Sequence, residues 1–334
     1  MEKNLIGSEL YDFSDIPGSS SWLLVSRIKK GHSNDLKFCI IDEDHQKYFM
    51  RLTDPQTYER KKNDFEHLRK LVAIGSMVPE PVSFGPCQHG QYVHFLSRWI
   101  HGDAGEQKLL KLPPMFKYNL GTAAGFCLKE AHYYSLVQRS AYAWEQSQLD
   151  RWRKIRDLYR RGHSKIACFH KLEGMIENDL KLLAGRPQCL LHGNFTTDNI
   201  VLGHNNCLSL IGFNNSRYGD PLHDLASVVT VIRRTCLQYA LGVLHCYYPH
   251  GIREKSMRLI NLYAAIGLVE QVIFAQDTSQ SALDAAVENV QVFMRDLQGC
   301  RQTMPIWYRQ VRATCKKANL TDAADLYVAD SEQT

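Results

Sequence analysis

Short apolar runs separated by polar turns fill the first hundred residues of the chain. Such runs predict strands, because a strand that packs against a core needs few residues and ends at turn-forming side chains. One longer segment, Tyr58–Ala73, instead repeats its apolar positions at helical spacing. We therefore expect a small sheet with one helix; the predicted strands are Trp22–Ile28, Lys37–Ile41, Lys47–Leu52 and Gln91–Ile100.

Helical periodicity dominates after residue 100. The predicted helices are Tyr118–His132, Arg151–Lys165, Leu172–Leu183, Ser227–Leu244, Ile252–Ala275 and Ser281–Leu297. Three short apolar runs interrupt them and predict strands at Cys189–Leu191, Asn199–Leu202 and Leu208–Phe213. The pattern predicts an α+β protein with two lobes: a sheet-rich part over residues 1–100, a helical part over 101–300, and a loosely docked tail over 301–334.

The bulk composition is that of an ordinary globular protein. The 334 residues are 44% hydrophobic and 22% charged, and the net charge of +5 is too small to indicate a polyanion or membrane partner by itself. The ten cysteines are scattered without zinc-like spacing, which favours a reducing compartment. The most apolar helical stretch, Leu259–Ala275, is short for a membrane span. We expect a soluble cytoplasmic protein with no membrane partner.

The chemical signal is concentrated between residues 189 and 226, in the sequence CLLHGNFTTDNIVLGHNNCLSLIGFNNSRYGDPLHDLA. Its frame resembles the catalytic segment of the aminoglycoside phosphotransferase and choline kinase group, a branch of the protein-kinase-like fold. That group carries His-Gly-Asp, then Asn, then Ile-Asp-Phe or Ile-Asp-Trp, Gly-Asp-Pro and Asp-Leu-Ala. The matching residues here are His192, Gly193, Asn199, Ile211, Phe213, Gly219, Asp220, Pro221, Asp224, Leu225 and Ala226.

The resemblance implies a cleft that binds ATP or another nucleotide. Arg51 lies where the strand-three lysine of the group is expected, and Asp64 on the following helix is the expected partner carboxylate, with Glu66 as the alternative. Adenine would contact the backbone of the link between lobes, from Ser97 to Trp99. The turn at Lys30–Asp35, with Gly31, would cover the phosphates.

Two chemical positions depart from the family pattern. The aspartate that accepts the proton of the attacking hydroxyl is replaced by Asn194, and the aspartate that holds magnesium is replaced by Gly212. An amide has no usable proton affinity at neutral pH, and glycine offers no ligand. Asn199 keeps the second metal position, and His192 is expected to hold the backbone of the loop. A relocated acid is the alternative. Its candidates are Asp198, which strand alternation would point away from Asn199, and Asp220 at the edge of the same hairpin, which more often helps to close the loop.

Three functional hypotheses follow. The first is a pseudokinase-like protein that binds a nucleotide, without a requirement for magnesium, together with an unknown small molecule or protein. The second is an active ATP-dependent phosphotransferase with an alcohol acceptor, which uses relocated acidic residues. The third is an anion or nucleic-acid binder that uses the basic helix Arg151–Lys165. The family frame favours the first two, Asn194 and Gly212 favour the first, and nucleic acid is the least expected partner.

Overall fold

The computed structural model of the chain describes residues 11–29, 35–136, 141–163, 165–167, 169–203 and 207–317. The chain folds into two compact units. The sheet unit contains the described residues up to Asp103 and the segment Val201–Asn214, and the helical unit contains the remainder. The observed boundary lies three residues beyond the expected one, and the segment Val201–Asn214, which we had assigned to the helical part, groups with the sheet.

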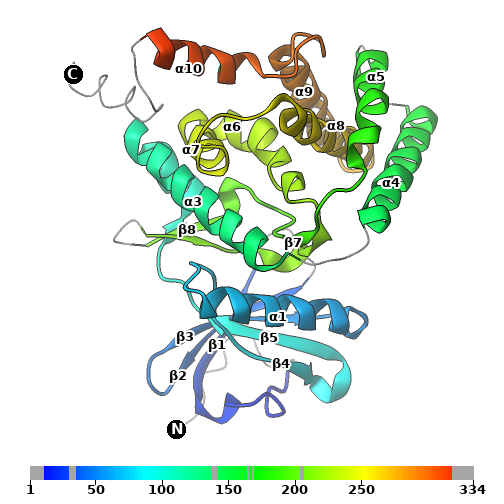
Figure 1. The fold of residues 1–334 in the computed structure, drawn as a ribbon. Helices are drawn as coiled ribbons and strands as arrows, with labels where there is room; N and C mark the ends of the chain where they lie inside the picture. The colour runs from blue at the N-terminus through cyan, green and yellow to red at the C-terminus, as the bar shows by residue number, and fades with distance from the viewer. Residues whose placement is uncertain are drawn as a thin grey trace. The chain divides into compact units, whose positions relative to one another are not determined.

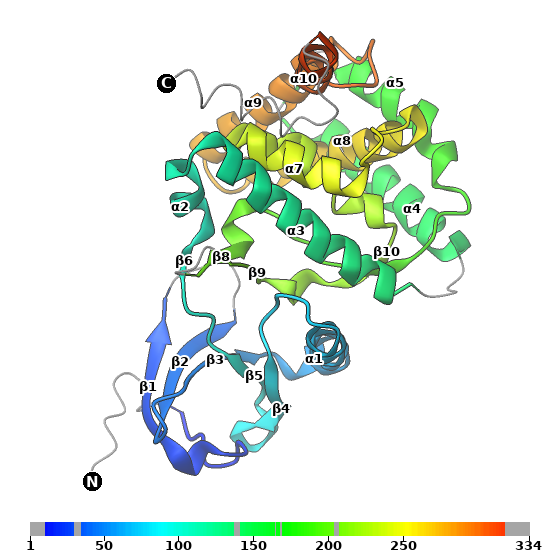
Figure 2. The ribbon, with the colours of Figure 1, turned by 60° about the vertical axis from the view of Figure 1, so that its left-hand side comes forward.

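The sheet unit is built on five antiparallel strands in the order β1-β2-β3-β5-β4. Aromatic and branched side chains on one face form its core, which includes Trp22, Phe38, Met50 and Leu96. Figures 1 and 2 show this sheet with the single helix α1 beside it. The elements are β1 Trp22–Ile28, β2 Leu36–Asp42, β3 Lys47–Thr53, α1 Tyr58–Ala73, β4 Pro81–Cys87 and β5 Tyr92–Arg98.

The predictions for this unit are confirmed in type and nearly in extent. The helix α1 has the predicted bounds because its apolar positions Leu68 and Leu71 are buried and Asp54–Pro55 ends the preceding strand. The predicted turn that includes Gly31 falls on residues 30–34, which lie outside the described residues.

The helical unit surrounds α8, a core helix with most of its side chains buried. Helices α3 and α7 lie side by side in Figures 1 and 2. The helices are α2 Gly105–Lys111, α3 Pro114–Tyr134, α4 Ala141–Arg161, α5 Phe169–Asp179, α6 Arg233–Thr235, α7 Leu237–Tyr247, α8 Glu254–Gln276, α9 Gln280–Asp296 and α10 Ile306–Lys317. The short strands are β6 Asp103–Ala104, β7 Cys189–Leu191, β8 Ile200–Leu202, β9 Leu208–Leu210 and β10 Arg217–Gly219.

Several features of these elements differ from the predictions, among them α4, which begins at Ala141 and not at Arg151. The helix predicted over Ser227–Leu244 is broken: a π-helical turn at Val228–Ile232 leads into α6, and extended backbone at Cys236 separates α6 from α7. The strand predicted over Leu208–Phe213 stops at Leu210, before left-handed Gly212. The helix α2 was not predicted. Finally, residues 306–317 form α10, and its Trp307 and Tyr308 are buried, so this part of the expected tail is packed.

Helix α8 begins two residues later and ends one residue later than the predicted helix Ile252–Ala275. Its 23 residues are long and apolar enough to cross a membrane by length and composition, with a mean hydropathy of 1.4 in the most apolar window. However, 61% of that window is buried inside the protein, as is usual for the central helix of a helical core.

Candidate functional site

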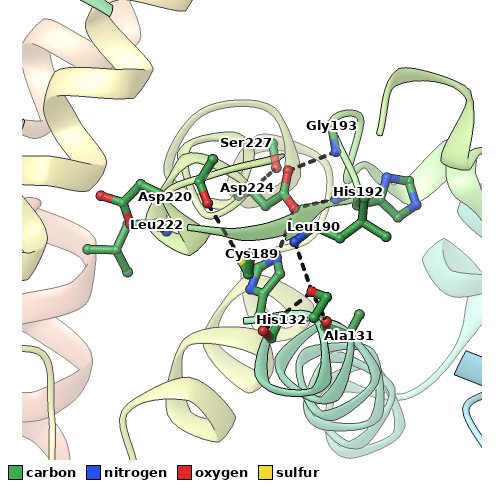
Figure 3. Close-up of polar contacts among 12 residues, drawn as sticks. Ala131, His132, Cys189, Leu190, His192, Gly193, Asp220, Leu222, Asp224 and Ser227 are labelled. Carbon is green, nitrogen blue, oxygen red and sulfur yellow. Dashed lines mark hydrogen bonds and ion pairs between the residues drawn. The ribbon is translucent and has the colours of Figure 1, made fainter. Parts of the chain in front are cut away.

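The buried carboxylate of Asp224 holds the backbone of the loop that follows β7. Asp224 accepts hydrogen bonds from the backbone N–H groups of His192, at 2.6 Å, and Gly193, at 2.9 Å. Its Oδ2 also lies 3.0 Å from Nε2 of His132 on α3, as Figure 3 shows. Asp224 therefore fixes the loop backbone. His132 has the structural role that its place near the end of α3 indicated.

The charge of Asp224 is stabilised although the side chain is 3% exposed. Burial alone would raise the pKa of this carboxyl, but the hydrogen bond and charge of His132, with His192 and His223 nearby, hold the pKa at about 2. The loop thus rests on a permanently ionised aspartate at neutral pH.

A second buried carboxylate fixes the other end of the motif. Asp220 caps the short helical turn that starts at Pro221 by accepting from the Leu222 N–H at 3.0 Å. It also forms a bidentate ion pair with Arg186, at 2.5 and 3.0 Å, and accepts from the Tyr263 hydroxyl at 2.9 Å. These contacts occupy Asp220 fully, so it is a structural residue of the frame.

The loop around Asn194, where the resemblance places the general base, has a tightly constrained backbone. Gly193 has a left-handed φ of 76°, and a Cβ there would lie 2.1 Å from the carbonyl oxygen of Asn215, so only glycine fits. Asn194 follows with an exposed side chain, while its N–H donates to Nδ1 of buried His192 at 3.3 Å. His192 therefore supports the backbone as expected, and the exposed group is an amide in place of a carboxylate.

The remaining metal position does not fit magnesium. The Nδ2 of Asn199 donates to the backbone oxygen of Asn194 at 2.8 Å, so this side chain helps to hold the loop. Gly212 has no side chain and a left-handed φ of 84°. Magnesium prefers carboxylate oxygens, and neither position supplies one. Within the described residues, no three His, Cys, Asp or Glu side chains gather in a possible metal site.

Asp198 lies in a different environment from the one we predicted. Residues Thr197–Asn199 form a 3₁₀ turn, so the strand alternation that we used to place Asp198 does not apply. Glu106, in the first turn of α2, accepts from the Thr197 hydroxyl at 2.8 Å. That bond lowers the pKa of Glu106, but burial and the hydrogen-bonded Asp198 carboxyl together raise it above its ordinary value. The carboxyls of Glu106 on α2 and Asp198 in the turn therefore lie next to each other.

The sheet unit brings three cations together, which we call the phosphate cluster: Lys37, Arg51 and Lys61. Lys37 and Arg51 are directly opposite each other on β2 and β3, and Lys61 is buried on α1. Burial lowers the pKa values of Arg51 and Lys61, while Asp35 and Asp64 oppose that effect. Asp64 is buried and Glu66 is exposed, which favours Asp64 as the partner carboxylate. Like charges opposite each other in a sheet are unfavourable, and Asp35, with its Oδ2 3.9 Å from Nη1 of Arg51, balances part of this positive charge.

The predicted adenine contacts need a correction. The N–H of Arg98 donates to Glu80 at 2.8 Å and the N–H of Trp99 donates to Lys47 at 2.9 Å, so sheet bonds occupy both donors. Ser97 is 3% exposed and its hydroxyl donates to the Phe49 carbonyl. In the described part of the chain, the next residues with no backbone partner for their N–H groups are Ile100 and His101.

The basic helix is largely neutralised by its neighbours. Trp152, Ile155 and Tyr159 are buried as predicted, and the cations lie on the other faces of α4. Four of these arginines form ion pairs with carboxylates, which are Arg151 with Glu270, Arg153 with Asp150, Arg156 with Glu177 and Arg160 with Glu173. This pairing disfavours the hypothesis that α4 binds nucleic acid.

Comparison with known families agrees with the frame of the loop. The profile described as the phosphotransferase enzyme family matches residues 25–247, which is more than half of the chain. The chain belongs to the phosphotransferase enzyme family. The match covers both the phosphate cluster and the loop from His192 to Asn199. No curated protein matches the sequence.

Solved structures of this family share the protein-kinase-like fold with the chain. An aminoglycoside phosphotransferase from Alicyclobacillus acidocaldarius is 15% identical, with 87% of this chain and 92% of that chain covered and a TM-score of 0.57. APH(4)-Ia is 14% identical, with 83% and 94% covered and a TM-score of 0.57. APH(2")-IIa in complex with gentamicin is 19% identical, with 80% and 90% covered and a TM-score of 0.56.

Three residues of the candidate site were missed in the sequence. Lys37 was read only as the start of a strand. Lys61 was not distinguished from the other charged residues of α1. It lies three residues before Asp64 and hence on the same inward face of the helix. Glu106 lies in a helix that we did not predict, 91 residues from its partner Thr197. No local pattern could have joined those two residues.

Proposed function

We propose that this chain is a nucleotide-binding member of the phosphotransferase enzyme family whose phosphoryl transfer is impaired or lost. The observation that carries the proposal is the loop after β7. Its backbone supports are retained in Asp224, His192 and Gly193, whereas Asn194 presents an amide where the transferred proton must be accepted. Loss of general-base help alone costs roughly two to four orders of magnitude in rate.

The phosphate cluster supports binding of the nucleotide without magnesium. Phosphoryl oxygens need positive charge around them, and in this chain Lys37, Arg51 and Lys61 supply it from the protein. Relatives of the same fold have been seen with nucleotides, since a thermostable APH(4)-Ia mutant forms ternary complexes with ADP and with AMP-PNP in the presence of hygromycin B. Adenine would then contact the backbone of Ile100 and His101.

We expect ATP to bind the protein with nearly the same affinity in magnesium and in excess EDTA, because neither Asn199 nor Gly212 supplies a metal carboxylate. Isothermal titration calorimetry of both conditions measures this directly. Lys61→Met should lower the affinity by about tenfold or more, since it removes a buried charge-assisted contact. Lys62→Met, at the exposed neighbouring position, is the matched control and should bind as the wild type does. Tight binding that appears only with magnesium would overturn the proposal.

The carboxyl pair of Glu106 and Asp198 favours a second candidate function, an active transferase with an alcohol acceptor. A carboxyl whose pKa is raised by a neighbouring carboxyl, as that of Glu106 is by Asp198, is an arrangement that general acid–base chemistry uses. In that case Asp198→Asn should abolish ATP turnover, whereas Asn194→Ala should leave it unchanged.

We place the protein in the cytoplasm, in keeping with its free thiols, of which Cys87, Cys127, Cys189 and Cys236 are buried.

A further inference from the structure

The helical unit contains a polar cavity that shares no residue with the loop after β7. Its volume is about 400 Å³, within the range of small-molecule sites. Three elements line it: one face of α5, the first turns of α8 and the connection from α9 to α10.

The walls of this cavity carry an excess of positive charge. Lys171 and Arg301 line it, and in the described part of the chain neither forms an ion pair. Arg258 also lines the cavity, but its guanidinium is neutralised by buried Asp179. His170 adds an imidazole at the rim. Lys171 and Arg301 therefore face the space without an ion pair among the described residues, while Asp179 on Arg258 and Glu254 beside Thr303 are the nearby carboxylates.

A buried amide supplies the second feature. Asn261 on α8 is 2% exposed, and its Nδ2 donates to the carbonyl oxygen of Thr303 at 2.8 Å. That bond fixes the amide orientation, and the Oδ1 is left as a buried acceptor without a partner among the described residues. A buried acceptor without a donor costs about 1–3 kcal/mol, and a ligand hydroxyl would satisfy it.

The connection that closes the cavity is strained. Gln298, Gly299 and Cys300 have φ values of 51°, 70° and 65°, so two residues other than glycine use left-handed backbone angles here. The Gln302 N–H donates to the Leu297 carbonyl at 3.1 Å and holds the connection in place. Burial raises the pKa of the Cys300 thiol to about 11, so this group remains neutral and does not cancel the nearby cations.

We propose that this cavity binds a small phosphate monoester that also carries hydroxyl groups. Lys171 and Arg301 would hold the dianionic phosphate, and a hydroxyl would donate to Oδ1 of Asn261. The site is independent of the nucleotide, because none of its lining residues belongs to the phosphate cluster or to the loop after β7.

Calorimetric titration of the full chain with glucose 6-phosphate tests the proposal. Glucose lacks the phosphate and inorganic phosphate lacks the carbon-bound hydroxyls, so each probe isolates one half of the recognition. We expect glucose 6-phosphate to bind at least about tenfold more tightly than either. The double variant Lys171→Ala/Arg301→Ala should weaken that binding at least about tenfold, and both positions are exposed enough to leave the fold intact.

Lys181→Ala removes an exposed cation that lies just after α5 and outside the cavity, and it should bind as the wild type does. Equal affinity in the double variant and the wild type would place the phosphate elsewhere, for example at the phosphate cluster, and overturn the proposal. Absence of binding at millimolar glucose 6-phosphate would overturn it too. Inorganic phosphate that binds as tightly as glucose 6-phosphate would overturn the role of Asn261.

Discussion

Two neighbouring residues, His223 and Asp224, are both held in their deprotonated forms by their surroundings, the first as a neutral imidazole and the second as a carboxylate. Asp224 stays ionised through its contact with His132. His223 has both Arg151 and Arg217 within 3.4 Å of its Nε2, so that nitrogen must act as an acceptor. Burial first, and the charge of Arg217 next, lower the pKa of His223 to about 3. The imidazole is therefore neutral in the folded protein and takes up a proton only on unfolding.

This difference predicts how stability depends on pH. Between the folded pKa of about 3 and the ordinary value of 6.5, the unfolded chain binds a proton at His223 that the folded chain does not. The free energy of unfolding should therefore fall as the pH falls through this range, by about 1.4 kcal/mol per pH unit for this one group. Urea unfolding of the wild type and of His223→Gln at several pH values measures the contribution. A wild-type slope that equals the slope of His223→Gln would contradict the prediction.

At the scale of elements, glycines set how closely α3 and α7 approach. A Cβ at Gly121 would lie 2.1 Å from the carbonyl oxygen of Tyr239, and one at Gly125 would lie 2.9 Å from that of Val243. Gly242 makes the reciprocal approach from α7, at 2.1 Å from the Tyr118 carbonyl. The close packing that the two glycines of α3 indicated in the sequence is confirmed.

Gly121→Ala should destabilise the protein by about 1–3 kcal/mol, because the added methyl group meets backbone that cannot move aside. At Gly267, in the middle of α8, an added methyl group would have no described atom within 4 Å, which makes this position the matched control. Gly267→Ala should stabilise by about 0.5–1 kcal/mol through helix propensity. Thermal or denaturant unfolding of the two variants distinguishes the steric clash from helix propensity. Equal changes in the free energy of unfolding would show that helix propensity alone determines both.

Elements with a strong local signal were predicted well, and elements shaped by distant contacts were not. The bounds of α1 follow from its own apolar spacing and its preceding Asp54–Pro55. The run from Ser227 to Leu244 has apolar residues on both sides of the break at Cys236 and contains neither proline nor glycine near it, so the sequence gives no sign of the break. The 3₁₀ turn at Thr197–Asn199 packs against α2, which lies far away in the sequence.

At the scale of the whole molecule, the sequence motif located the frame of the candidate site and the two missing carboxylates. It could not locate Lys61 or Glu106, because each depends on contacts between segments that the motif does not contain. The structure therefore adds the cations of the phosphate cluster and the carboxyl of Glu106, while the family match explains why the frame is kept.

Restoring both carboxylates should restore chemistry. Asn194→Asp returns a proton acceptor and Gly212→Asp returns a metal ligand, and neither single variant should suffice because the two groups act together. The double variant should show magnesium-dependent ATP hydrolysis at least about tenfold above the wild-type background. Circular dichroism and thermal unfolding must first show that each variant is folded. A wild type that already turns over at ordinary kinase rates, with no gain in the double variant, would instead favour the acid pair at Glu106 and Asp198.

The left-handed backbone at Gly212 makes the loss of its carboxylate hard to reverse. Any residue with a Cβ is strained at a φ of 84°, by about 1–2 kcal/mol, so aspartate returns to this position at a cost in stability. A stabilising substitution elsewhere would offset that cost, so Gly212→Asp should be tolerated better in a stabilised background than in the present sequence.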